Sequence, residues 1–144
     1  MTIRDTAITA IMTDEPTTIE RSKPISEAYH LLRDAPFHHL VVTDGEAPVA
    51  MLATSDILRL VYDVDGAADD QALSAYIDHQ FTIDDAMTAD LKTVTVAGTV
   101  LDVATMLSDG ALHSVVVLAA DGSLAGIVTT TDLARHLCAL LSRA

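Results

Sequence analysis

The 144-residue sequence is poor in aromatic residues, in cysteine and in basic residues. With three tyrosines, two phenylalanines and no tryptophan, any core must consist mainly of the aliphatic and methionine side chains that make half the chain hydrophobic. The single cysteine, Cys138, excludes an intrachain disulfide and a cysteine-based zinc site. Its apolar helical neighbours predict a packed thiol rather than a nucleophile. A chain of this length fits one compact domain or two small, closely packed ones.

Positive charge is scarce as well. The chain has 8 lysines and arginines against 21 aspartates and glutamates, which gives a net charge of −13. Sequence-independent binding of DNA or RNA depends on clustered basic residues, so this composition argues against a nucleic-acid partner. The same charge repels an anionic ligand on average, and such a ligand would need backbone amides and well-placed hydroxyls to hold it.

Long hydrophobic runs are also missing. No apolar stretch approaches the roughly 20 residues that a membrane-spanning helix needs. The first residues, Met1 to Asp5, lack the charged-then-apolar layout of a secretory signal. We therefore expect a cytoplasmic protein that does not bind a membrane.

What the sequence does contain is an internal repeat. Short motifs of the first half return 75 residues later and, after one inserted residue, 76 residues later. The matching pairs are Met12-Thr13 with Met87-Thr88, Thr18-Ile19 with Thr93-Val94, His38 with His113, Val41-Val42 with Val116-Val117, Asp56 with Asp132, and Arg59 with Arg135. A repeated unit that cannot bury its apolar face alone is expected to pack against its copy. The cleft between two such copies is where we expect a binding site.

Each half has the hydrophobic pattern of a strand, a helix, two strands and a second helix. The expected elements are residues 17–19, 24–34, 40–43, 49–53 and 55–62 in the first half, and 93–96, 100–107, 115–118, 125–128 and 131–141 in the second. The uninterrupted apolar run from Val115 to Leu118 is typical of a strand covered on both faces. Thr99 and Asp102 have the spacing of a capping box at the start of a helix. The pattern predicts an α/β fold.

An acidic segment between the halves belongs to neither copy. We divide the chain into a first repeat at residues 8–62, an acidic linker at 63–82 and a second repeat at 83–141. Residues 63–66 have the composition of a turn. Residues 69–77 are expected to form a short helix.

The strongest local motif is Gly126-Ile127-Val128-Thr129-Thr130-Thr131-Asp132, in which a strand ends in three hydroxyl residues and an acid opens the next helix. One interpretation is helix capping, in which a threonine satisfies free amides and Asp132 is favoured by the helix dipole. The other is ligand binding, in which hydroxyls and amides hold a phosphate while the carboxylate accepts both hydroxyls of a ribose. The motif recurs in both halves, beside a histidine each time, and this recurrence favours ligand binding.

The Met-Thr start, the apolar helix, the His-x-apolar-Val-Val strand and the Gly-Ile-Val-Thr-x-x-Asp ending resemble the cystathionine-β-synthase (CBS) domain. Two tandem copies, over about residues 8 to 141, resemble the pair known as a Bateman module. The resemblance implies two CBS-type β-α-β-β-α repeats packed with pseudo-twofold symmetry into one disc-like α/β module, often as a homodimer. It also implies a regulatory module, not an enzyme, that binds an adenosine-containing ligand and signals by changing shape. The family's ligands include AMP, ADP, ATP, S-adenosylmethionine and dinucleotides.

The resemblance assigns phosphate and ribose contacts in one cleft, which has the residues of the family's binding motif. Asp132 would hold the ribose hydroxyls, while Thr129 and Thr131 would hydrogen-bond phosphate. His113 and His38 would lie near the phosphates. No cofactor is required, since the adenosine nucleotide acts as a ligand.

The resemblance also assigns the base pocket of that cleft. Ile127 and Phe37 would line the adenine, and the backbone near Thr17 would read its edge. The chain departs from the family's nucleotide sensors in one respect, because His39 and Ser114 stand where those proteins often place arginine. Histidine is mostly neutral near pH 7, so we expect AMP or a non-phosphorylated adenosyl ligand to bind better than a triphosphate.

A second cleft is predicted to be weaker. Asp56 and Ser55 remain there, and Lys92 could supply a cation. Ala50 replaces the usual glycine, and Ala53 replaces the hydroxyl residue three before the acid. A phosphate that lacks one hydrogen-bond partner loses about 1–3 kcal/mol. We therefore expect one ligand per chain, or two of unequal affinity.

Other functions find less support in the sequence. His38 and His39 would face opposite ways on a strand, and no carboxylates converge on them to form a metal site. No Ser-His-acid or Cys-His spacing and no glycine-rich phosphate loop indicates an enzyme. Two alternatives stay open: a structural or protein-interaction module with vestigial ligand clefts, and an enzyme of unrecognised type. In the sensor interpretation, a separate protein partner would read the ligand-bound state.

Overall fold

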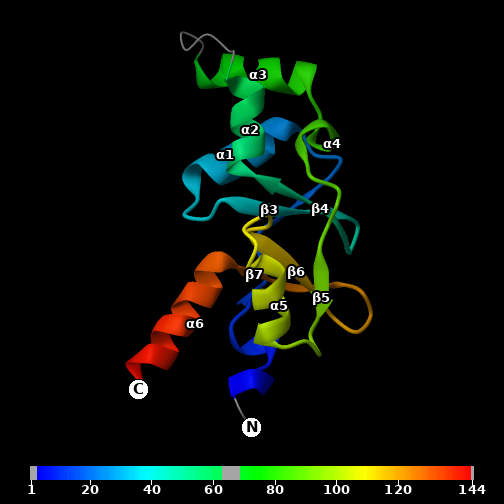
Figure 1. The fold of residues 1–144 in the computed structure, drawn as a ribbon. Coiled ribbons are helices and arrows are strands. Elements are labelled where there is room, and N and C mark those ends of the chain that lie inside the picture. The colour runs from blue at the N-terminus through cyan, green and yellow to red at the C-terminus, as the bar shows by residue number, and fades with distance from the viewer. Residues whose placement is uncertain (1–2, 63–68, 144) are drawn as a thin grey trace. The chain divides into compact units, whose positions relative to one another are not determined.

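A computed structural model describes residues 3–62 and 69–143, and this part of the chain forms a mixed α/β fold with two sheets (Figure 1). Contacts divide the chain into two compact units. The central unit runs from Thr17 to Asp90. The terminal unit combines the segment that ends at Pro16 with the segment that starts at Leu91.

The central unit contains a three-stranded sheet in the order β2-β3-β4. Strand β2 is parallel to β3, and β3 is antiparallel to β4. The elements are β2 (Thr18–Glu20), α1 (Ile25–Asp34), β3 (His39–Asp44), β4 (Ala47–Ala53), α2 (Thr54–Val61), α3 (Asp70–Gln80) and α4 (Ile83–Ala86). Helix α3 covers the stretch where a short linker helix is expected, while residues 63–68, with the predicted turn, lie outside the described residues.

The terminal unit contains a four-stranded sheet in the order β1-β7-β6-β5. Strand β5 is parallel to β6, whereas β7 is antiparallel to both β6 and β1. The elements are the 3-10 helices η1 (Ile3–Asp5) and η2 (Ile8–Ala10), then β1 (Thr13–Asp14), β5 (Thr93–Thr95), α5 (Val100–Leu107), β6 (Ser114–Leu118), β7 (Leu124–Thr129) and α6 (Thr130–Ser142). Both units therefore have the predicted strand, helix, strand, strand, helix order.

The first residues of each sequence repeat pack on the sheet that contains the other repeat's strands. In the terminal unit, Thr13 of β1 pairs with Ile127 of β7. In the central unit, Thr88 forms the matching bridge with Met51 of β4. The compact units are therefore assembled by an exchange of the two repeat starts, which the order of residues along the chain does not reveal.

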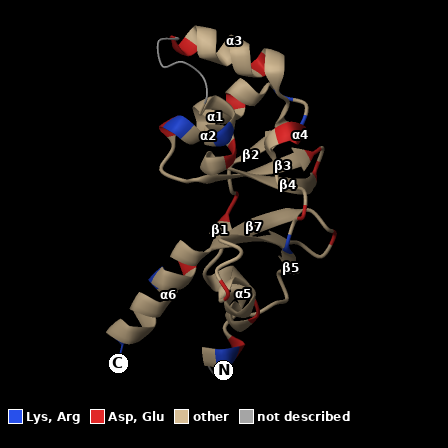
Figure 2. Ribbon diagram, turned by 45° about the horizontal axis from the view of Figure 1, so that its top comes forward, with Lys and Arg blue, Asp and Glu red and all other residues tan. Residues whose placement is uncertain are grey.

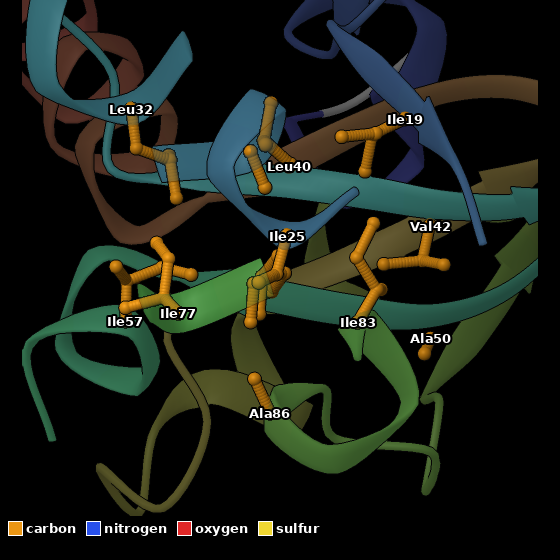
Figure 3. Close-up of a cluster of buried hydrophobic side chains, with 12 residues drawn as sticks. Ile19, Ile25, Leu32, Leu40, Val42, Ala50, Ile57, Ile77, Ile83 and Ala86 are labelled. Carbon is orange, nitrogen blue, oxygen red and sulfur yellow. The ribbon is translucent and has the colours of Figure 1, made fainter. Parts of the chain in front are cut away.

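Aliphatic side chains fill both cores, as the composition predicts. Figure 3 shows the central core, in which residues from the sheet and from the helices converge. Its largest fully buried members are Ile25, Leu40, Leu52, Ile77 and Ile83. The terminal core is smaller and consists of Ile8, Val103, Leu107, Val115, Val117 and Val128. Helix α3 contributes Ile77 as its only buried residue, so the linker helix is part of the central core.

Two helices at matching positions start in different ways. Thr99 and Asp102 form the predicted capping box of α5: the Thr99 amide donates to Asp102 Oδ2 at 2.9 Å, and the Asp102 amide donates to Thr99 Oγ1 at 3.2 Å. The N-cap of α1 is Pro24, which has neither an N–H nor a capping oxygen. There, Asp78 of α3 accepts hydrogen bonds from the Ser26 amide at 2.8 Å and from the Ser26 hydroxyl at 2.6 Å.

Candidate functional site

Asp132 lies at the third position of α6, and its side chain caps that helix. The Thr129 amide donates to Asp132 Oδ2 at 2.9 Å, and the Asp132 amide donates to Thr129 Oγ1 at 3.3 Å. Asp132 is 7% exposed, one of the few buried charged residues in the described chain. Helix capping therefore uses one of the two carboxylate oxygens, Oδ2.

The second oxygen of Asp132 faces a pocket. Thr13 Oγ1 donates to Asp132 Oδ1 at 3.5 Å, and Arg135 Nη1 stands 3.9 Å from the same oxygen. Asp132, Thr13 and Arg135 all line one pocket of about 380 Å³ in the terminal unit. The remaining lining residues are Ala10, Ile11, Met12 and His136. Because both groups that approach Oδ1 line this pocket, that oxygen borders it.

This arrangement suits a small ligand that carries hydroxyls. A carboxylate oxygen with spare lone pairs accepts hydrogen bonds from hydroxyls, as in a sugar. Arg135 adds a fixed positive charge, and Ile11 and Met12 supply apolar wall. The volume falls within the roughly 300–1,000 Å³ of typical small-molecule sites.

A glycine allows residues 12 and 13, which line this pocket, to lie close to strand β7. A Cβ at Gly126 would lie 2.6 Å from the Thr13 carbonyl oxygen and 3.0 Å from Met12 Sδ. Only glycine allows such a close approach between β1 and β7. Gly126 thereby places Thr13 within reach of Asp132.

The matching site in the central unit has a more fully occupied carboxylate. The Ala53 amide donates to Asp56 Oδ2 at 2.8 Å, but Ala53 has no side-chain oxygen to complete a capping box. Arg59 Nη2 donates to the other oxygen, Oδ1. A ligand hydroxyl that binds Asp56 Oδ1 must therefore compete with the Arg59 guanidinium.

The strand pairing beside Asp56 is also shorter. Ala50 stands where the terminal unit has Gly126, and its side chain is fully buried. In the terminal unit two residue pairs join β1 and β7, whereas in the central unit Thr88 and Met51 form a single bridge. A Cβ at this position blocks the second pair, because Gly126 shows how closely the partner carbonyl would approach.

The two predicted phosphate histidines occupy equivalent places. His38 and His113 are both exposed, and each precedes a central strand of its sheet. The His38 carbonyl accepts a hydrogen bond from the Thr54 amide at 2.9 Å, and the His113 carbonyl accepts one from the Thr130 amide at 3.1 Å. Their backbone therefore helps to start α2 and α6.

The residues predicted to bind ligand are divided between the two units. The terminal unit contains Asp132, Thr129, Thr131, Ile127, His113 and Lys92. The central unit contains Thr17, Phe37, His38, Asp56 and Ser55. A cleft that draws on both sets stays a prediction.

Within the units, most of these residues have a clear structural place. Ile127 is 8% exposed in β7, and Phe37 packs against the central core. The Thr17 carbonyl accepts a hydrogen bond from the Val41 amide at 3.2 Å. Thr131 and Ser55 are exposed in the first turns of α6 and α2. Of the whole set, Asp132 is the member that lines the 380 Å³ pocket.

Sequence reasoning missed the other six lining residues of this pocket. The repeat did mark three of them, because Met12-Thr13 returns as Met87-Thr88 and Arg135 is the copy of Arg59. What the repeat did not indicate is that the first residues of one copy pack beside the acid of the other. His136, Ile11 and Ala10 carry no such signal.

Neither a metal centre nor a membrane span is found in the described residues. No group of three or more histidine, cysteine, aspartate or glutamate side chains is arranged to hold a metal ion within residues 3–62 and 69–143. In the same part of the chain, no helix combines the length and apolar character needed to cross a bilayer.

Two units with the same β-α-β-β-α order, each with an acid at the third position of the helix that closes this order (Asp56 in α2, Asp132 in α6), define a tandem-repeat α/β protein. A family model described as CBS domain matches residues 8–63 and 83–139. The chain therefore belongs to the CBS domain family, and the predicted family and fold class are confirmed. Among curated proteins, none has a significantly similar sequence.

Solved CBS structures have the same fold at low sequence identity. The CBS domain pair of protein MJ0100, in complex with 5′-methylthioadenosine and S-adenosyl-L-methionine, has a TM-score of 0.75 and 23% identity, over 93% of this chain and 97% of that one. CBSX2 in complex with AMP also has a TM-score of 0.75 and 23% identity, over 96% and 99%. CBSX2 from Arabidopsis thaliana has a TM-score of 0.77 and 21% identity, over 96% and 99%.

Proposed function

We propose that this protein is a non-catalytic regulatory module that binds an adenosine-containing ligand, with AMP the foremost candidate, and signals by a change of shape. The observation that carries the proposal is Asp132 Oδ1, which borders a pocket and is not consumed by the helix cap. Complexes of related folds with AMP, 5′-methylthioadenosine and S-adenosyl-L-methionine support an adenosyl ligand. Thr129, Thr131, Ile127, His113, Thr17, Phe37 and His38 complete the proposed set.

The charges around the pocket favour a ligand with one phosphate. Arg135 is the fixed cation among the lining residues, and it stands beside the Asp132 carboxylate. A chain of net charge −13 repels the additional charges of a triphosphate. ADP and ATP are therefore weaker candidates for the same place, whereas this charge argument does not apply to S-adenosylmethionine, which carries no phosphate.

A thermal-unfolding panel tests the proposal. Adenosine, AMP, ADP, ATP and S-adenosylmethionine are compared with GMP as a control for the base. A ligand at 100 times its Kd adds about 2.7 kcal/mol to the free energy of unfolding. We expect AMP to raise the melting temperature most and GMP least. If no adenosyl compound moves the transition, the sensor proposal fails and a structural module with vestigial clefts takes its place.

A homodimer is part of the proposal, and α6 supplies a surface for it. Ala134, Leu137, Cys138 and Leu141 follow helical spacing and are all exposed; we call them the outer stripe. The prediction of a packed Cys138 thiol is therefore wrong for the single chain. Leu137 and Leu141 are 55% and 65% exposed. Beside the stripe, α6 carries Arg135 and is followed by Arg143, against the single acid Asp132, so a second copy meets little repulsion there (Figure 2). A helix of this length is about 20 Å long, so the stripe alone gives a small, weak interface.

Sedimentation velocity at increasing protein concentration tests the dimer. Leu137→Glu together with Leu141→Glu should shift the protein to monomer, while Leu101→Glu, at an exposed leucine of α5, should not. Oxidative cross-linking through Cys138 gives a second measurement, because the stripe brings two copies of this thiol close together. A protein that stays monomeric at high concentration contradicts the dimer without affecting the ligand proposal.

The geometry around Asp56 in the central unit favours the alternative of a structural or protein-interaction module. Both oxygens of Asp56 are engaged by Ala53 and Arg59, as a structural or protein-interaction module with closed clefts would have them. Mass spectrometry of small molecules that co-purify with the protein separates the two functions. The repeat boundaries at 8–62 and 83–141, the cytoplasmic location and a separate protein partner remain parts of the proposal that rest on the sequence.

A further inference from the structure

The central unit contains a second and larger pocket. It has a volume of about 600 Å³ and lies between the β2–α1 connection and the segment that joins α3 to α4. The residues that line it are Arg21, Ser22, Lys23, Pro24, Ile25, Asp78, Phe81, Thr82 and Asp84. None of them belongs to the ligand-binding set proposed above.

This pocket lies at the opposite end of the sheet from Asp56. Strand β2 runs parallel to β3, and β4 runs antiparallel to both. The pocket follows the last residue of β2, Glu20, whereas Asp56 follows the last residue of β4, Ala53. The carboxyl ends of antiparallel strands lie at opposite edges, so the pocket is separate from the Asp56 site.

The terminal unit closes the equivalent place. The Ile8 amide donates to the Gly98 carbonyl at 3.2 Å, and the Val100 amide donates to the Thr6 carbonyl at 2.9 Å. These bonds form a bridge between Ala7 and Thr99. By the repeat, the counterparts of Ala7 and Thr99 are Thr82 and Pro24, and no bridge joins that pair in the described chain.

The two units differ in one residue at this place. A Cβ at Gly98 would lie 2.9 Å from Ile8 Cδ1 and 3.2 Å from the Thr95 carbonyl oxygen. The counterpart of Gly98 is Lys23, which has a Cβ and a long side chain. In an approach as close as that of the terminal unit, a side chain here would meet the tip of Ile83, the counterpart of Ile8.

Two polar contacts hold the walls of the pocket. Arg21 Nη2 donates to Asp84 Oδ2 at 2.9 Å, and the Ser26 hydroxyl donates to Asp78 Oδ2 at 2.6 Å. Hydrogen bonding and charge at Asp84 raise the pKa of the Arg21 guanidinium, which stays charged. Both acids of the pocket therefore already accept hydrogen bonds. Lys23 is exposed and has no ion pair within the described part of the chain.

We propose that this pocket binds a small organic anion with a flat apolar body, such as an aromatic carboxylate. Ile25, Pro24 and Phe81 supply apolar surface, and the ring of Phe81 can stack on an aromatic ligand. Arg21 is already paired with Asp84, whereas Lys23 is the lining cation without an ion pair in the described residues, and its ammonium suits a carboxylate or a phosphate. The proposal does not depend on the adenosyl site at Asp132.

Three probes of one shape and different charge test the pocket: 4-fluorobenzoate, 4-fluorobenzyl alcohol and 4-fluorobenzylamine. Their affinities are measured by fluorine NMR on the full chain, and amide shifts locate the site. We expect 4-fluorobenzoate to bind about fivefold more tightly than the alcohol, the ratio that about 1 kcal/mol from one exposed ion pair gives. Shift changes should centre on Ile25 and Phe81. Equal or tighter binding of the amine overturns the proposal, because Asp78 would then dominate.

Variants at position 23 separate charge from shape. Lys23→Met keeps the side-chain bulk and should abolish the preference for benzoate over the alcohol. Lys23→Gly restores the residue of the terminal unit, lets the Ile83 segment approach and should weaken all three probes. Arg4→Met, at an exposed position of the terminal unit, is the charge-matched control and should change nothing. If Lys23→Met keeps the preference for benzoate, Lys23 is not the anion contact and the proposal is wrong.

Discussion

The guanidinium of Arg59 donates a hydrogen bond to Oδ1 of Asp56, three residues earlier in α2. At the matching place in α6, Arg135 stands 3.9 Å from Asp132 Oδ1, beside a pocket. The arginine and the aspartate are thus joined by a hydrogen bond in the central unit, whereas in the terminal unit they stand 3.9 Å apart. This asymmetry is the structural basis for expecting two sites of unequal affinity.

Arg59→Met should strengthen adenosine binding at the central unit. The variant frees Asp56 Oδ1 while it keeps most of the apolar part of the side chain. The Arg59 side chain is 73% exposed, so the broken pair is worth at most about 1 kcal/mol, or about fivefold in affinity. Isothermal calorimetry with adenosine measures the effect. Weaker binding by the variant would mean that Arg59 contacts the ligand instead of competing with it.

Exchanging the N-cap residues of α2 and α6 should change the free energy of unfolding in opposite directions. Thr129→Ala removes the hydroxyl that accepts from the Asp132 amide and should lower the free energy of unfolding by about 1 kcal/mol. Ala53→Thr supplies the missing oxygen and should raise that free energy by up to about 1 kcal/mol. Urea unfolding measures both. If Ala53→Thr destabilises the protein, the difference between the two caps has another cause.

Gly126→Ala should destabilise the terminal unit. The added Cβ would lie 2.6 Å from the Thr13 carbonyl oxygen, so β1 must move away from β7. We expect a loss of about 1–3 kcal/mol, which is the usual range for overpacking. Hydrogen exchange should become faster at amides of β1, while the β3 amides of the central unit serve as the internal control. Unchanged exchange at β1 would mean that the strand does not depend on the close approach.

The Asp34 carboxyl should titrate below the usual range. Its hydrogen bond with Arg33 lowers the pKa of Asp34, since the guanidinium stabilises the ionised form. A depressed folded-state pKa contributes stability that is present above the ordinary value of about 3.9 and is lost as pH falls through the folded pKa. Carboxyl-detected NMR measures this pKa. Arg33→Met should return it towards the ordinary value, and an unchanged pKa would contradict the assigned cause.

Most of the fold could be predicted from local sequence. The repeated apolar pattern predicted the order of strands and helices, because periodicity reports which faces are buried. The Thr99–Asp102 capping box was predictable, since both partners lie within one helical turn. The start of α1 was not, because its cap comes from Asp78, on the linker helix α3, about fifty residues later in the chain.

The candidate site was predictable only in part. Asp132 stood out because its motif is local and repeated, and the structure places it at a pocket. The facing residues Ile11, Met12 and Thr13 come from a segment that pairs with a strand more than a hundred residues later. Periodicity does not report such long-range pairing. The pocket at Lys23 was missed for a similar reason, since only the geometry around Gly98 reveals what a side chain does there.

Calorimetric titration of AMP into Asp132→Ala and into Asp56→Ala shows which carboxylate holds the ligand. Asp132→Ala should abolish the tighter binding event, because it removes the oxygen that borders the pocket. Asp56→Ala should change that event little, because Asp56 is already engaged by Arg59 and Ala53. Circular dichroism of both variants establishes that each is folded. Loss of AMP binding in folded Asp56→Ala, with binding retained in folded Asp132→Ala, would mean that the ligand site is the one at Asp56.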